Sequence, residues 1–497
     1  MKVRDLLRDV PVRTVRGDVD VEITSVTGDS RLAVPGSLFI AVPGFKTDGA
    51  NFIDSAVSKG AAAVVSETAV NVPLLVEVDD ARIALALIAA NFYGRPAGKL
   101  SLVGVTGTSG KTTTTKMIES ILDSSGEPAG LIGTIEYRAG DERLTADRTT
   151  PDAVVLQQWF AKMVDAGVRH AVMEVSSHAL ALKRTHGIRF DAAVFTNLSQ
   201  DHFDFHKDFE DYFAAKRILF NQIDRSRKSA IVNIDDEYGR RLARELGDCV
   251  VTFGRGANAD IRPLDGFDIS VRGLRGRLAT PMGELRLDSR LLGAPNLYNW
   301  LGAVGAALSV GIDIATVEAG IRSLSVVRGR FEYVEGDEGD EGPTVIVDYA
   351  HKPDALEKLL QAVRDLADDR RVVLLVGCGG DRDKDKRAKM GAIAARLADH
   401  TVLTSDNPRS EKPEAILDDI ESGMLGAGNY ARISDRREAI LRTILDASNN
   451  DVIVIAGKGH ESYQVIGDQV VHFDDREEAQ RALKTRHENR TSKSRSN

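Results

Sequence analysis

The chain has 497 residues, of which 42% are hydrophobic and 28% are charged, and its formal net charge is −9. This length and composition predict a globular protein of about three domains. The acidic balance argues against general nucleic-acid binding, which needs a basic face. No apolar run approaches the roughly 18 residues that a membrane span requires.

The two cysteines, Cys249 and Cys378, lie far apart in the sequence, so they indicate neither a disulfide framework nor a zinc site. Residues 1–9 carry acidic side chains and lack a long apolar core, which is not the pattern of a signal peptide. We therefore expect a cytoplasmic protein without a membrane span.

The first part of the chain, residues 1–98, is predicted to be a small α/β domain. Short β-rich runs alternate with helical patterns, and glycines punctuate them. The β-rich runs cover 23–27, 37–42, 62–66 and 74–78, and the helical patterns cover 53–59 and 81–93. The segment 94–98 reads as a linker to the next domain.

The second part, residues 99–329, opens on the run Gly-Val-Thr-Gly-Thr-Ser-Gly-Lys-Thr-Thr at 104–113, between an apolar run and a helical pattern. A strand, a glycine-rich turn and a helix start together form an anion site. The strict phosphate-loop pattern has glycine where Val105 stands, so we interpret the run as a variant phosphate loop. Lys111 would reach the terminal phosphates, and the Thr112 hydroxyl would bind Mg²⁺.

Polar side chains follow the next two predicted strands of this domain. Strand 170–175 contains Glu174 near its end, and strand 191–195 leads into a loop rich in aspartate and histidine. Ligands bind at the carboxyl ends of parallel strands, and hard divalent cations take oxygen ligands with an occasional imidazole. Glu174 is therefore a candidate Mg²⁺ ligand, or else a surface acid at the end of its strand. The loop places four such groups, Asp201, His202, Asp204 and His206, within six residues after a strand, which favours a site there.

The rest of the second domain carries weaker signals. Lys216 lies in a predicted helix over 212–220 and, read alone, is a solvated lysine. Residues 251–295 read as β-hairpins. An Ala/Gly-rich helical pattern covers 301–311, and its small residues would let the helix pack closely on a sheet. Asn296 and Asn299 precede this pattern, where they could cap the helix or bind a purine edge; capping is the better interpretation.

The third part, residues 330–485, repeats one pattern four times: a buried strand, a Gly/Asp/Arg/His-rich loop and a helix. The strands are predicted at 344–348, 371–376, 401–404 and 451–455. This pattern is typical of a Rossmann-like, doubly wound parallel sheet with its functional loops along one edge. The acidic segment 335–342 is predicted to be a hairpin tip, and the polar tail 486–497 to be disordered.

The loops of the third domain suggest an amino-acid substrate. Arg382 and Arg409 could bind a carboxylate through paired hydrogen bonds, and Glu461 could bind an ammonium group. ATP on the second domain and an amino acid on the third suggest that a carboxylate is activated as an acyl phosphate and then attacked by an amine.

Six motifs together closely resemble the Mur ligases, the ATP-dependent amide ligases of peptidoglycan precursor synthesis. They lie at 107–113, 174–180, 197–206, 214–216, 349–354 and 457–461, and the resemblance extends over nearly the whole chain. Asp-Asn-Pro-Arg at 406–409 resembles the signature of the diaminopimelate-adding type. The resemblance implies an N-terminal UDP-muramoyl domain, a central ATPase-like domain and a C-terminal amino-acid domain.

The resemblance also implies roles for individual residues. For catalysis it points to Lys111, Glu174, His202, Lys216 and His351, and for Mg²⁺ to Thr112, Glu174, His202 and a carbamylated Lys216. For ATP it points to Gly107, Thr108, Ser109, Gly110, Lys111, Thr112, Thr113, Asn296, Arg330 and Asp348. For the UDP-muramoyl-dipeptide it points to Ser30, Thr149, Thr150, Ser176 and Arg184. For diaminopimelate it points to Arg382, Asp406, Asn407, Pro408, Arg409, Gly457 and Glu461. Leu182 and Arg148 depart from the family pattern.

The implied reaction serves cell wall biogenesis, and through it cell shape and division. ATP phosphorylates the D-glutamyl γ-carboxylate of UDP-N-acetylmuramoyl-L-alanyl-D-glutamate, and the amine of meso-diaminopimelate displaces the phosphate. Mg²⁺ is the implied cofactor and ATP a co-substrate. These small molecules are the expected partners, and we expect a monomer that binds no nucleic acid.

Three alternatives stay open at this point. A lysine-adding ligase of the same family and a folylpolyglutamate synthetase share the fold, but Ser30, the Thr149–Thr150 pair and Arg409 argue against them. A nucleotide-binding scaffold without ligase activity is the non-enzyme alternative. Lys216 and His202 argue against the scaffold, since a scaffold needs no second metal.

Overall fold

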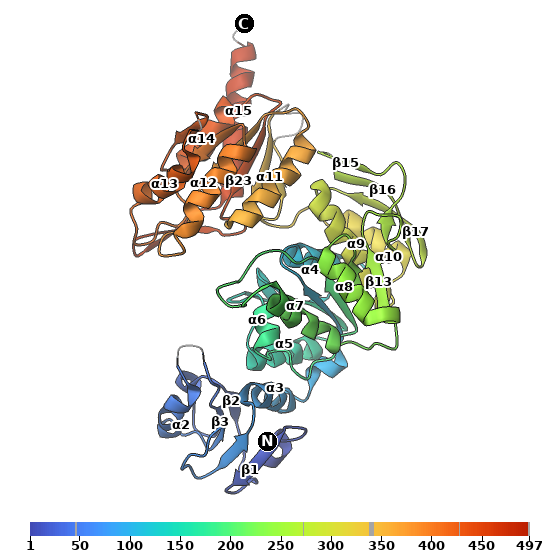
Figure 1. Cartoon of the computed structure of the whole chain (residues 1–497), viewed down its shortest axis with the longest axis vertical. Helices are drawn as coiled ribbons and strands as arrows, with labels where there is room; N and C mark the ends of the chain where they lie inside the picture. The colour runs from blue at the N-terminus through green and yellow to red at the C-terminus, as the bar shows by residue number, and fades with distance from the viewer. Residues whose placement is uncertain (45–46, 272, 337–341, 427, 496–497) are drawn as a thin grey trace. The chain divides into compact units, whose positions relative to one another are not determined.

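The computed structural model describes residues 1–44, 47–271, 273–336, 342–426 and 428–495, with side chains to residue 491 (Figure 1). These residues form two compact units, each described here by itself. Unit 1 comprises Met1–Arg262, Ala279–Gly283 and Asn299–Gly320, and unit 2 comprises Pro263–Leu278, Glu284–Tyr298 and Ile321–Asn497. Of the predicted acidic hairpin tip, residues 337–341 lie outside the described residues.

Unit 1 begins with a five-stranded sheet in the order β1-β5-β4-β3-β2. Its strands are β1 (Val12–Arg16), β2 (Ser25–Thr27), β3 (Ser37–Ile40), β4 (Ala63–Ser66) and β5 (Leu75–Val78). Strands β2 to β5 are mutually parallel, and β1 runs antiparallel to β5. The four predicted runs are thereby confirmed as strands, while β1 was not predicted.

Helices cover both faces of this first sheet because successive strand residues point to opposite sides. Leu38 and Ile40 pack with α3 (Ala81–Phe92), whereas Phe39 packs with α2 (Ile53–Ser58). Both helices lie where the sequence predicted them. The linker segment forms a short 3-10 helix, Pro96–Lys99, before the next sheet.

The second sheet of unit 1 has eight strands in the order β13-β12-β11-β6-β10-β7-β8-β9. Neighbours from β13 to β7 pair in parallel, and β8 and β9 add antiparallel strands. In chain order the strands are β6 (Ser101–Thr106), β7 (Gly130–Ile132), β8 (Glu136–Ala139), β9 (Glu142–Thr145), β10 (His170–Glu174), β11 (Ala192–Phe195), β12 (Ala230–Asn233) and β13 (Val250–Phe253). The central strands β11, β6 and β10 thus end side by side at one edge.

Six helices accompany this sheet, together with α10 (Ile314–Ser323). They are α4 (Lys111–Asp123), α5 (Ala153–Asp165), α6 (Ser177–Ala181), α7 (Phe209–Arg217), α8 (Glu237–Leu246) and α9 (Gly293–Ser309). Small residues let α9 approach the strands closely: a Cβ added at Gly305 would lie 2.8 Å from the Ile231 side chain. Such close packing is what the Ala/Gly-rich helix was predicted to provide.

Helix α9 begins eight residues earlier than the predicted start at residue 301. Pro295 is tolerated because it falls in the first turn, where its missing N–H costs no hydrogen bond. Asn296 and Asn299 are therefore inside the helix, and the interpretation of them as helix caps is wrong. The Asn296 amide instead donates to the Leu292 carbonyl at 2.9 Å.

A small sheet follows, in which β16 (Gly273–Thr280) pairs with β17 (Gly283–Ser289), β14 (Arg262–Pro263) and β15 (Asp268–Ser270). The pairing of β15 with β16 is antiparallel, with Asp268 opposite Arg275. The predicted β-hairpin character of residues 251–295 is thus confirmed for this segment.

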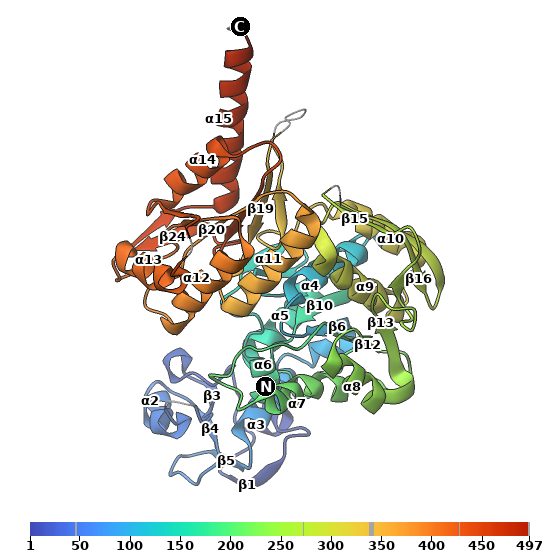
Figure 2. The same ribbon diagram turned by 45° about the horizontal axis from the view of Figure 1, so that its top comes forward.

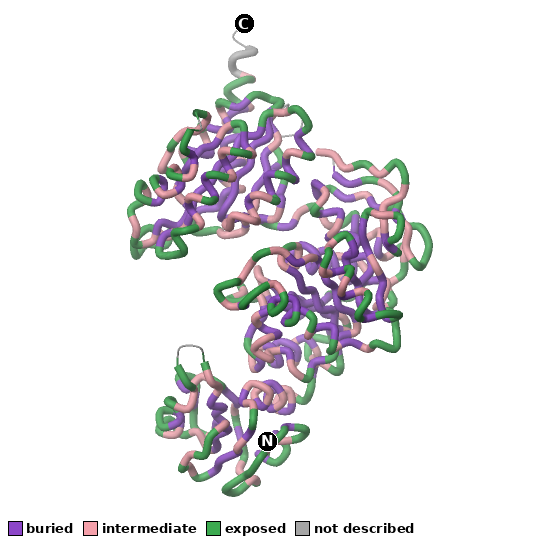
Figure 3. The backbone as a smooth tube through the Cα atoms, in the orientation of Figure 1, coloured by how far each residue is buried: buried purple, intermediate pink, exposed green. Residues whose placement is uncertain are grey.

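Unit 2 contains a six-stranded sheet in the order β18-β19-β23-β20-β21-β22, parallel except for β18. The strands are β18 (Glu332–Val334), β19 (Thr344–Asp348), β20 (Val372–Val376), β21 (His400–Leu403), β22 (Tyr430–Arg432) and β23 (Val452–Ala456). Figure 3 shows purple, buried backbone through the middle of this unit, and the central strands β20 and β23 are buried at every residue, whereas the edge strands β18 and β22 are exposed in part. The doubly wound sheet is confirmed.

Helices cover both faces of this sheet (Figure 1 and Figure 2). One face packs against α11 (Pro353–Ala367), α12 (Asp385–Leu397) and α13 (Pro413–Glu421), and the other against α14 (Arg436–Asp446) and α15 (Asp475–Arg495). Alternate residues of β20 point to opposite faces of the sheet: Leu374 packs with the first group of helices and Leu375 with the second. A hairpin of β24 (Tyr463–Ile466) and β25 (Gln469–His472) precedes α15.

The predicted disordered tail is wrong for residues 486–495, because α15 continues to Arg495. The Arg486 guanidinium donates to the carbonyls of Ile444 and Leu445 at 2.8 and 2.9 Å and to Asn449 at 3.0 Å. These hydrogen bonds attach α15 to the end of α14. The polar composition of the segment had predicted disorder, but it does not show such contacts. Residues 496–497 lie outside the described residues. Among the described residues, no helix is both long and apolar enough to cross a lipid bilayer.

A buried ion pair joins the starts of α14 and α15, and we expect it to be the most sensitive polar contact of unit 2. Arg436 and Asp475 are fully buried, with both guanidinium–carboxylate distances at 2.7 Å. Arg436→Met should destabilise this unit by about 3–5 kcal/mol, because it leaves a buried carboxylate without its cation. The thermal unfolding transition of the full-length chain measures the effect. The double variant R436M/D475L should recover part of the loss; equal stability of the single variant and the wild type would contradict the assignment.

Candidate functional site

The predicted phosphate loop connects β6 to α4. Gly107 and Gly110 have φ angles of +152° and +85°, which disfavour other residues. A Cβ at Gly107 would lie 1.9 Å from the Thr196 hydroxyl oxygen, so the loop backbone approaches its neighbour too closely for a side chain. Val105, at the position of the strict pattern's glycine, is buried within β6. The variation therefore lies in the strand and leaves the turn itself rich in glycine.

Helix α4 starts at Lys111, so the predicted loop residues stand at the helix N-terminus, where backbone N–H groups are available to an anion. The Lys111 ammonium donates to the carbonyls of Gly107 and Thr108 at 2.9 and 3.0 Å. Thr112 and Thr113 are buried in the first turn. The Lys111 side chain therefore folds back over the loop that is predicted to bind a phosphate.

The segment that follows β11 holds the phosphate loop from the side. The Thr196 hydroxyl donates to the Ser109 carbonyl at 2.6 Å, and the Ser109 N–H donates to the Asn197 side-chain oxygen at 3.0 Å. The Thr108 N–H donates to the Asn197 carbonyl at 2.9 Å. This support was not predicted, because it joins residues about 90 positions apart.

Glu174 lies at the end of β10 with only 1% of its surface exposed. Its carboxylate accepts hydrogen bonds from the Thr112 hydroxyl at 3.0 Å and from the Thr134 N–H and hydroxyl at 2.7 and 3.0 Å. Two of the predicted Mg²⁺ ligands, Thr112 and Glu174, are thus in contact. Thr134 is a member of this cluster that the sequence analysis missed, and no motif marks it.

Lys216 is buried on α7, which overturns the interpretation of it as a solvated lysine. Its Nζ donates to the Gly107 carbonyl at 2.8 Å and lies 4.4 Å from the ring centre of Tyr212. Burial, and then the nearby charge of Lys111, hold the pKa of the Lys216 amine well below its ordinary value. Burial thus favours the neutral amine over the ammonium form.

The aspartate- and histidine-rich loop packs against α6. His202 has a φ angle of +57°, pairs with Asp201 at 3.3 Å and lies edge-on to His178, with ring centres 4.7 Å apart. His206 is buried between the Ser177 hydroxyl at 3.0 Å and the Asp211 carboxylate at 3.2 Å. His206 therefore anchors the loop to α6.

The metal site expected in this loop stays a prediction. Among the residues that the structure describes, no group of three or more His, Cys, Asp or Glu side chains is arranged to hold a metal ion. The oxygen atoms of Thr112 and Glu174 are the predicted ligands that the structure brings into contact.

Four of the residues predicted for the UDP-muramoyl-dipeptide surround the end of β10. The Thr150 hydroxyl donates to the Glu174 carbonyl at 2.8 Å, and the Ser176 N–H donates to the Thr150 hydroxyl at 3.0 Å. The Arg184 guanidinium donates to the Thr150 carbonyl at 2.8 Å, and the Thr149 hydroxyl lies 3.0 Å from that of Thr134.

Arg184 gives this cluster its positive charge. Burial lowers the pKa of its guanidinium, and the neighbouring Arg148 lowers it further. The half-buried Arg184, with the exposed Arg148 nearby, favours an anionic ligand. Ser30, the fifth predicted residue, lies in the first sheet's domain at the start of a 3-10 helix (Ser30–Leu32), and its carbonyl accepts a hydrogen bond from Lys59.

In unit 2, three residues predicted for nucleotide binding or catalysis surround Tyr349. The half-buried Asp348 carboxylate accepts from the Phe331 and Ala350 N–H groups at 2.7 and 2.8 Å, and removal from solvent raises its pKa. The Arg330 guanidinium lies 4.7 Å from the centre of the Tyr349 ring. The His351 ring lies 4.5 Å from that ring, and burial lowers its pKa to about 4. Asn296 belongs to the same unit.

The predicted diaminopimelate residues gather where β21 and β23 end. The Asn407 side-chain N–H donates to the Glu461 carboxylate at 2.9 Å, and Arg409 donates to the Gly380 carbonyl at 2.7 Å. A Cβ at Gly457, whose φ is +119°, would lie 2.7 Å from the Asp406 carboxylate. Arg409 itself has a φ of +51°, an uncommon conformation for arginine.

The two remaining members of this group flank it. A Cβ at Gly380 would lie 1.9 Å from the Pro408 carbonyl, which places the loop after β20 directly against the loop after β21. Arg382 follows on the first of these loops with its side chain exposed. The seven residues therefore come from three adjacent strand ends of one sheet, as the doubly wound pattern predicted.

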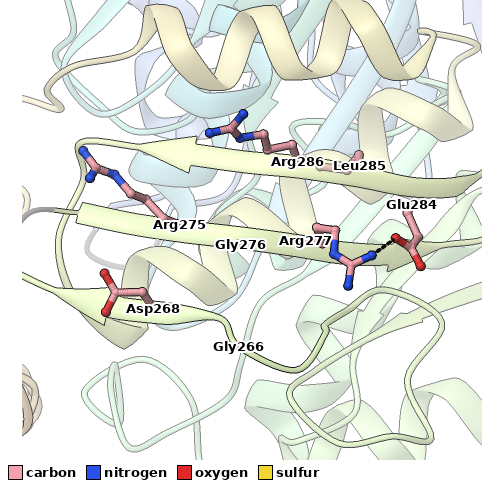
Figure 4. A pocket seen from close by; sticks show the side chains of 8 residues that line it. All are labelled: Gly266, Asp268, Arg275, Gly276, Arg277, Glu284, Leu285 and Arg286. Atoms are coloured by element: carbon pink, nitrogen blue, oxygen red, sulfur yellow. Dashed lines mark hydrogen bonds and ion pairs between the residues drawn. The ribbon is translucent and has the colours of Figure 1, made fainter.

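A concave surface that encloses a volume of about 680 Å³ lies elsewhere in unit 2, on β15, β16 and β17 (Figure 4). Its polar lining is largely paired: Arg277 contacts Glu284 at 2.8 Å, and Arg275 contacts Asp288 at 3.3 Å. None of the predicted site residues lines it. This concave surface is therefore separate from the predicted site.

Comparisons with known proteins agree with this geometry. Three family descriptions match the chain: "Mur ligase family, catalytic domain" over residues 22–93, "Mur ligase middle domain" over 105–307 and "Mur ligase, glutamate ligase domain" over 329–459.

Two relatives and one solved structure carry the same name, UDP-N-acetylmuramoyl-L-alanyl-D-glutamate–2,6-diaminopimelate ligase. The chain is 46% identical to the protein of Geobacillus thermodenitrificans, over 98% of the chain and 100% of the relative. It is 48% identical to that of Gloeobacter violaceus, over 98% and 99%. The solved structure is 31% identical with a TM-score of 0.72 and covers 98% of this chain and 99% of its own.

Proposed function

The chain belongs to the Mur ligase family, and we propose that it joins meso-diaminopimelate to the D-glutamyl γ-carboxylate of UDP-N-acetylmuramoyl-L-alanyl-D-glutamate, with ATP converted to ADP and phosphate. One observation carries the amino-acid assignment: Arg409 and Glu461 belong to neighbouring loops that Asn407 connects. A guanidinium and a carboxylate there match the carboxylate and ammonium of one amino-acid end.

The phosphate loop of unit 1 supports the ATP half of the reaction. Backbone N–H groups at the start of α4 and the Lys111 ammonium would bind the phosphates of ATP, as such loops do. Carboxyl phosphorylation needs a positioned acceptor and neutralised charge more than a covalent role for the protein. The loop residues and Lys111 would supply that neutralisation.

Mg²⁺ is the metal that the donor atoms of this site fit. The Thr112 hydroxyl and the Glu174 carboxylate lie 3.0 Å apart and are hard oxygen donors of the kind that Mg²⁺ prefers. Both are buried beside the phosphate loop, so we propose that they hold the ion, with His202 and a carbamylated Lys216 as further ligands. When bound, Mg²⁺ would neutralise charge on the phosphates of ATP.

Carbamylation of Lys216 follows from its environment. A neutral lysine amine attacks the carbon of CO₂ and loses a proton, and the product is a carbamate with one negative charge. Burial favours the neutral amine, which is the form that reacts. CO₂ is then the only reagent that this step requires. The carbamate would place negatively charged oxygens beside the phosphate loop that Lys216 already contacts.

The substrate roles of the other clusters are proposed on the same basis. Thr149, Thr150, Ser176 and Arg184, with Ser30, would hold the UDP-muramoyl-dipeptide. Asn296, Arg330, Asp348 and His351 of unit 2 would contribute to nucleotide binding and catalysis. We further propose domains at 1–98, 99–329 and 330–485, which assign these clusters to a UDP-muramoyl domain, an ATP domain and an amino-acid domain.

Phosphate release tests this function directly. ATP, Mg²⁺ and UDP-N-acetylmuramoyl-L-alanyl-D-glutamate are supplied with either meso-diaminopimelate or L-lysine in parallel. We expect release with diaminopimelate and little with lysine, because only diaminopimelate carries a second carboxylate for Arg409. Preference for lysine would retain a ligase but reject the proposed pocket. Slow ATP turnover that neither amine affects would favour the scaffold.

A further inference from the structure

Lys458 is a fully buried cation that the reaction proposed above does not use. It follows the end of β23, and none of its side-chain surface is exposed. Its Nζ donates to the Asn407 side-chain oxygen at 3.2 Å and to Oε2 of Glu461 at 3.3 Å. A buried ammonium group is costly unless it is paired, so these contacts call for an explanation.

The first contact sets the orientation of the Asn407 amide. The Val465 N–H donates to Oδ1 of Asn407 at 3.0 Å, and Lys458 donates to the same atom. Both partners are donors, so the amide oxygen must lie on their side. The amide nitrogen is therefore directed at Oε2 of Glu461, to which it donates at 2.9 Å.

The second contact engages only one of the two oxygen atoms of the Glu461 carboxylate. Oε2 accepts from both Asn407 and Lys458. No described residue donates a hydrogen bond to the side-chain oxygen Oε1, and 18% of the side chain is exposed. One oxygen is thus used to hold the carboxylate, and the other is left for a ligand.

Lys458 adds one positive charge to a place where Arg409 and Arg382 are the other predicted cations and Glu461 and Asp406 are the anions. Meso-diaminopimelate differs from lysine at one end only, where it carries a carboxylate beside the ammonium and so has no net charge. Removing Lys458 would make the pocket more negative by one charge, which favours the single ammonium of lysine over the zwitterionic end of diaminopimelate.

We propose that Lys458 is a positioning residue that determines which amine is selected. It holds Asn407 and Glu461 so that Oε1 of Glu461 accepts the substrate ammonium while Arg409 binds the carboxylate, and its charge disfavours an amine end that carries only an ammonium. This inference rests on the proposed function and adds to it a source of specificity.

The test compares kcat/KM for meso-diaminopimelate and for L-lysine in the full chain. Lys458→Met removes both the charge and the hydrogen bonds, and Lys458→Gln keeps a donor without the charge. Lys389→Met, an exposed lysine on α12, is the matched control. We expect both Lys458 variants to lower the ratio of the two kcat/KM values, diaminopimelate over lysine, by about tenfold to a hundredfold, the scale of one hydrogen bond to a charged group. The KM for ATP and the control should stay unchanged.

The outcomes separate a specific role from a structural one. Equal losses for both amines, or an unchanged ratio in a variant whose circular dichroism and thermal midpoint match the wild type, would overturn the inference. If the methionine variant does not fold, the glutamine variant carries the same comparison. A wild-type chain that uses neither amine overturns the proposed function itself, whereas wild-type selectivity that survives both substitutions overturns only the role of Lys458.

Discussion

Replacing Lys216 by methionine is expected to reduce phosphate release with diaminopimelate about a thousandfold. The buried amine contacts the Gly107 carbonyl of the phosphate loop, and its carbamate would add negative oxygens there. Losing one group that organises charge at a reacting centre has this order of effect. Steady-state rates at saturating ATP and UDP-muramoyl-dipeptide measure it, with Lys216→Gln as a variant that keeps a hydrogen-bond donor.

Removal of dissolved CO₂ distinguishes carbamylation from a role for the amine itself. In CO₂-depleted buffer the wild type should lose activity and regain it when bicarbonate returns, whereas the Lys216→Met variant should respond to neither change. An unaffected wild type would leave Lys216 important but exclude the carbamate.

The stability of the Lys216→Met variant provides an independent check. Burial lowers the folded-state pKa of this lysine, so between its folded-state and unfolded-state pKa values the unfolded chain binds more protons there than the folded chain. The uncarbamylated amine therefore opposes folding at pH values below its unfolded-state pKa, and stability rises with pH between the two pKa values. Methionine removes that opposition, so the thermal midpoint at neutral pH should not fall even though activity does. A large drop in midpoint would show that lost activity reflects unfolding.

The strand ends could be predicted because their signals are local. A buried parallel strand is a continuous apolar run, and the polar loop after it is adjacent in sequence. Glu174 and Glu461 were found in this way, whereas Asn407, which contacts Glu461, was implied only by the family resemblance. The phosphate loop was found because its glycines and lysine are consecutive.

The contacts that complete the site could not be read from the sequence. Thr134 reaches Glu174 across 40 positions, and Asn197 reaches the phosphate loop across 88. Lys216 looked solvated because burial depends on which face α7 turns to the sheet. Tyr212, one helical turn earlier and also buried, was the available signal for that face.

The errors at helix ends have a common cause. The start of α9 was placed too late because Gly293 and Pro295 normally interrupt helices, although proline is compatible with a first turn. The end of α15 was missed because charge suggested disorder, whereas Arg486 finds carbonyl partners on α14. In both cases local propensity was overridden by position or by tertiary contacts.

Replacing Arg409 by alanine is expected to lower kcat/KM for meso-diaminopimelate at least about a hundredfold and to leave kcat/KM for L-lysine nearly unchanged. The Arg409 guanidinium is held by the Gly380 carbonyl at 2.7 Å, and its backbone N–H donates to Val465 at 3.0 Å. It is therefore preorganised to offer its other N–H groups to a carboxylate, which lysine lacks. A site built to bind a polar group discriminates strongly against a substrate that lacks it.

The comparison of the two amines makes the Arg409 experiment decisive. Arg396→Ala, which removes an exposed arginine of α12 paired with Glu357, is the matched control and should change neither rate. Arg409→Lys should recover little of the loss, because an ammonium cannot offer the two parallel N–H groups of a guanidinium. If kcat/KM fell equally for both amines, Arg409 would be needed for the loop conformation and not for the second carboxylate. A selective loss for diaminopimelate would instead show that the guanidinium, fixed between the loops after β20 and β21, binds the one group that distinguishes the two amino acids.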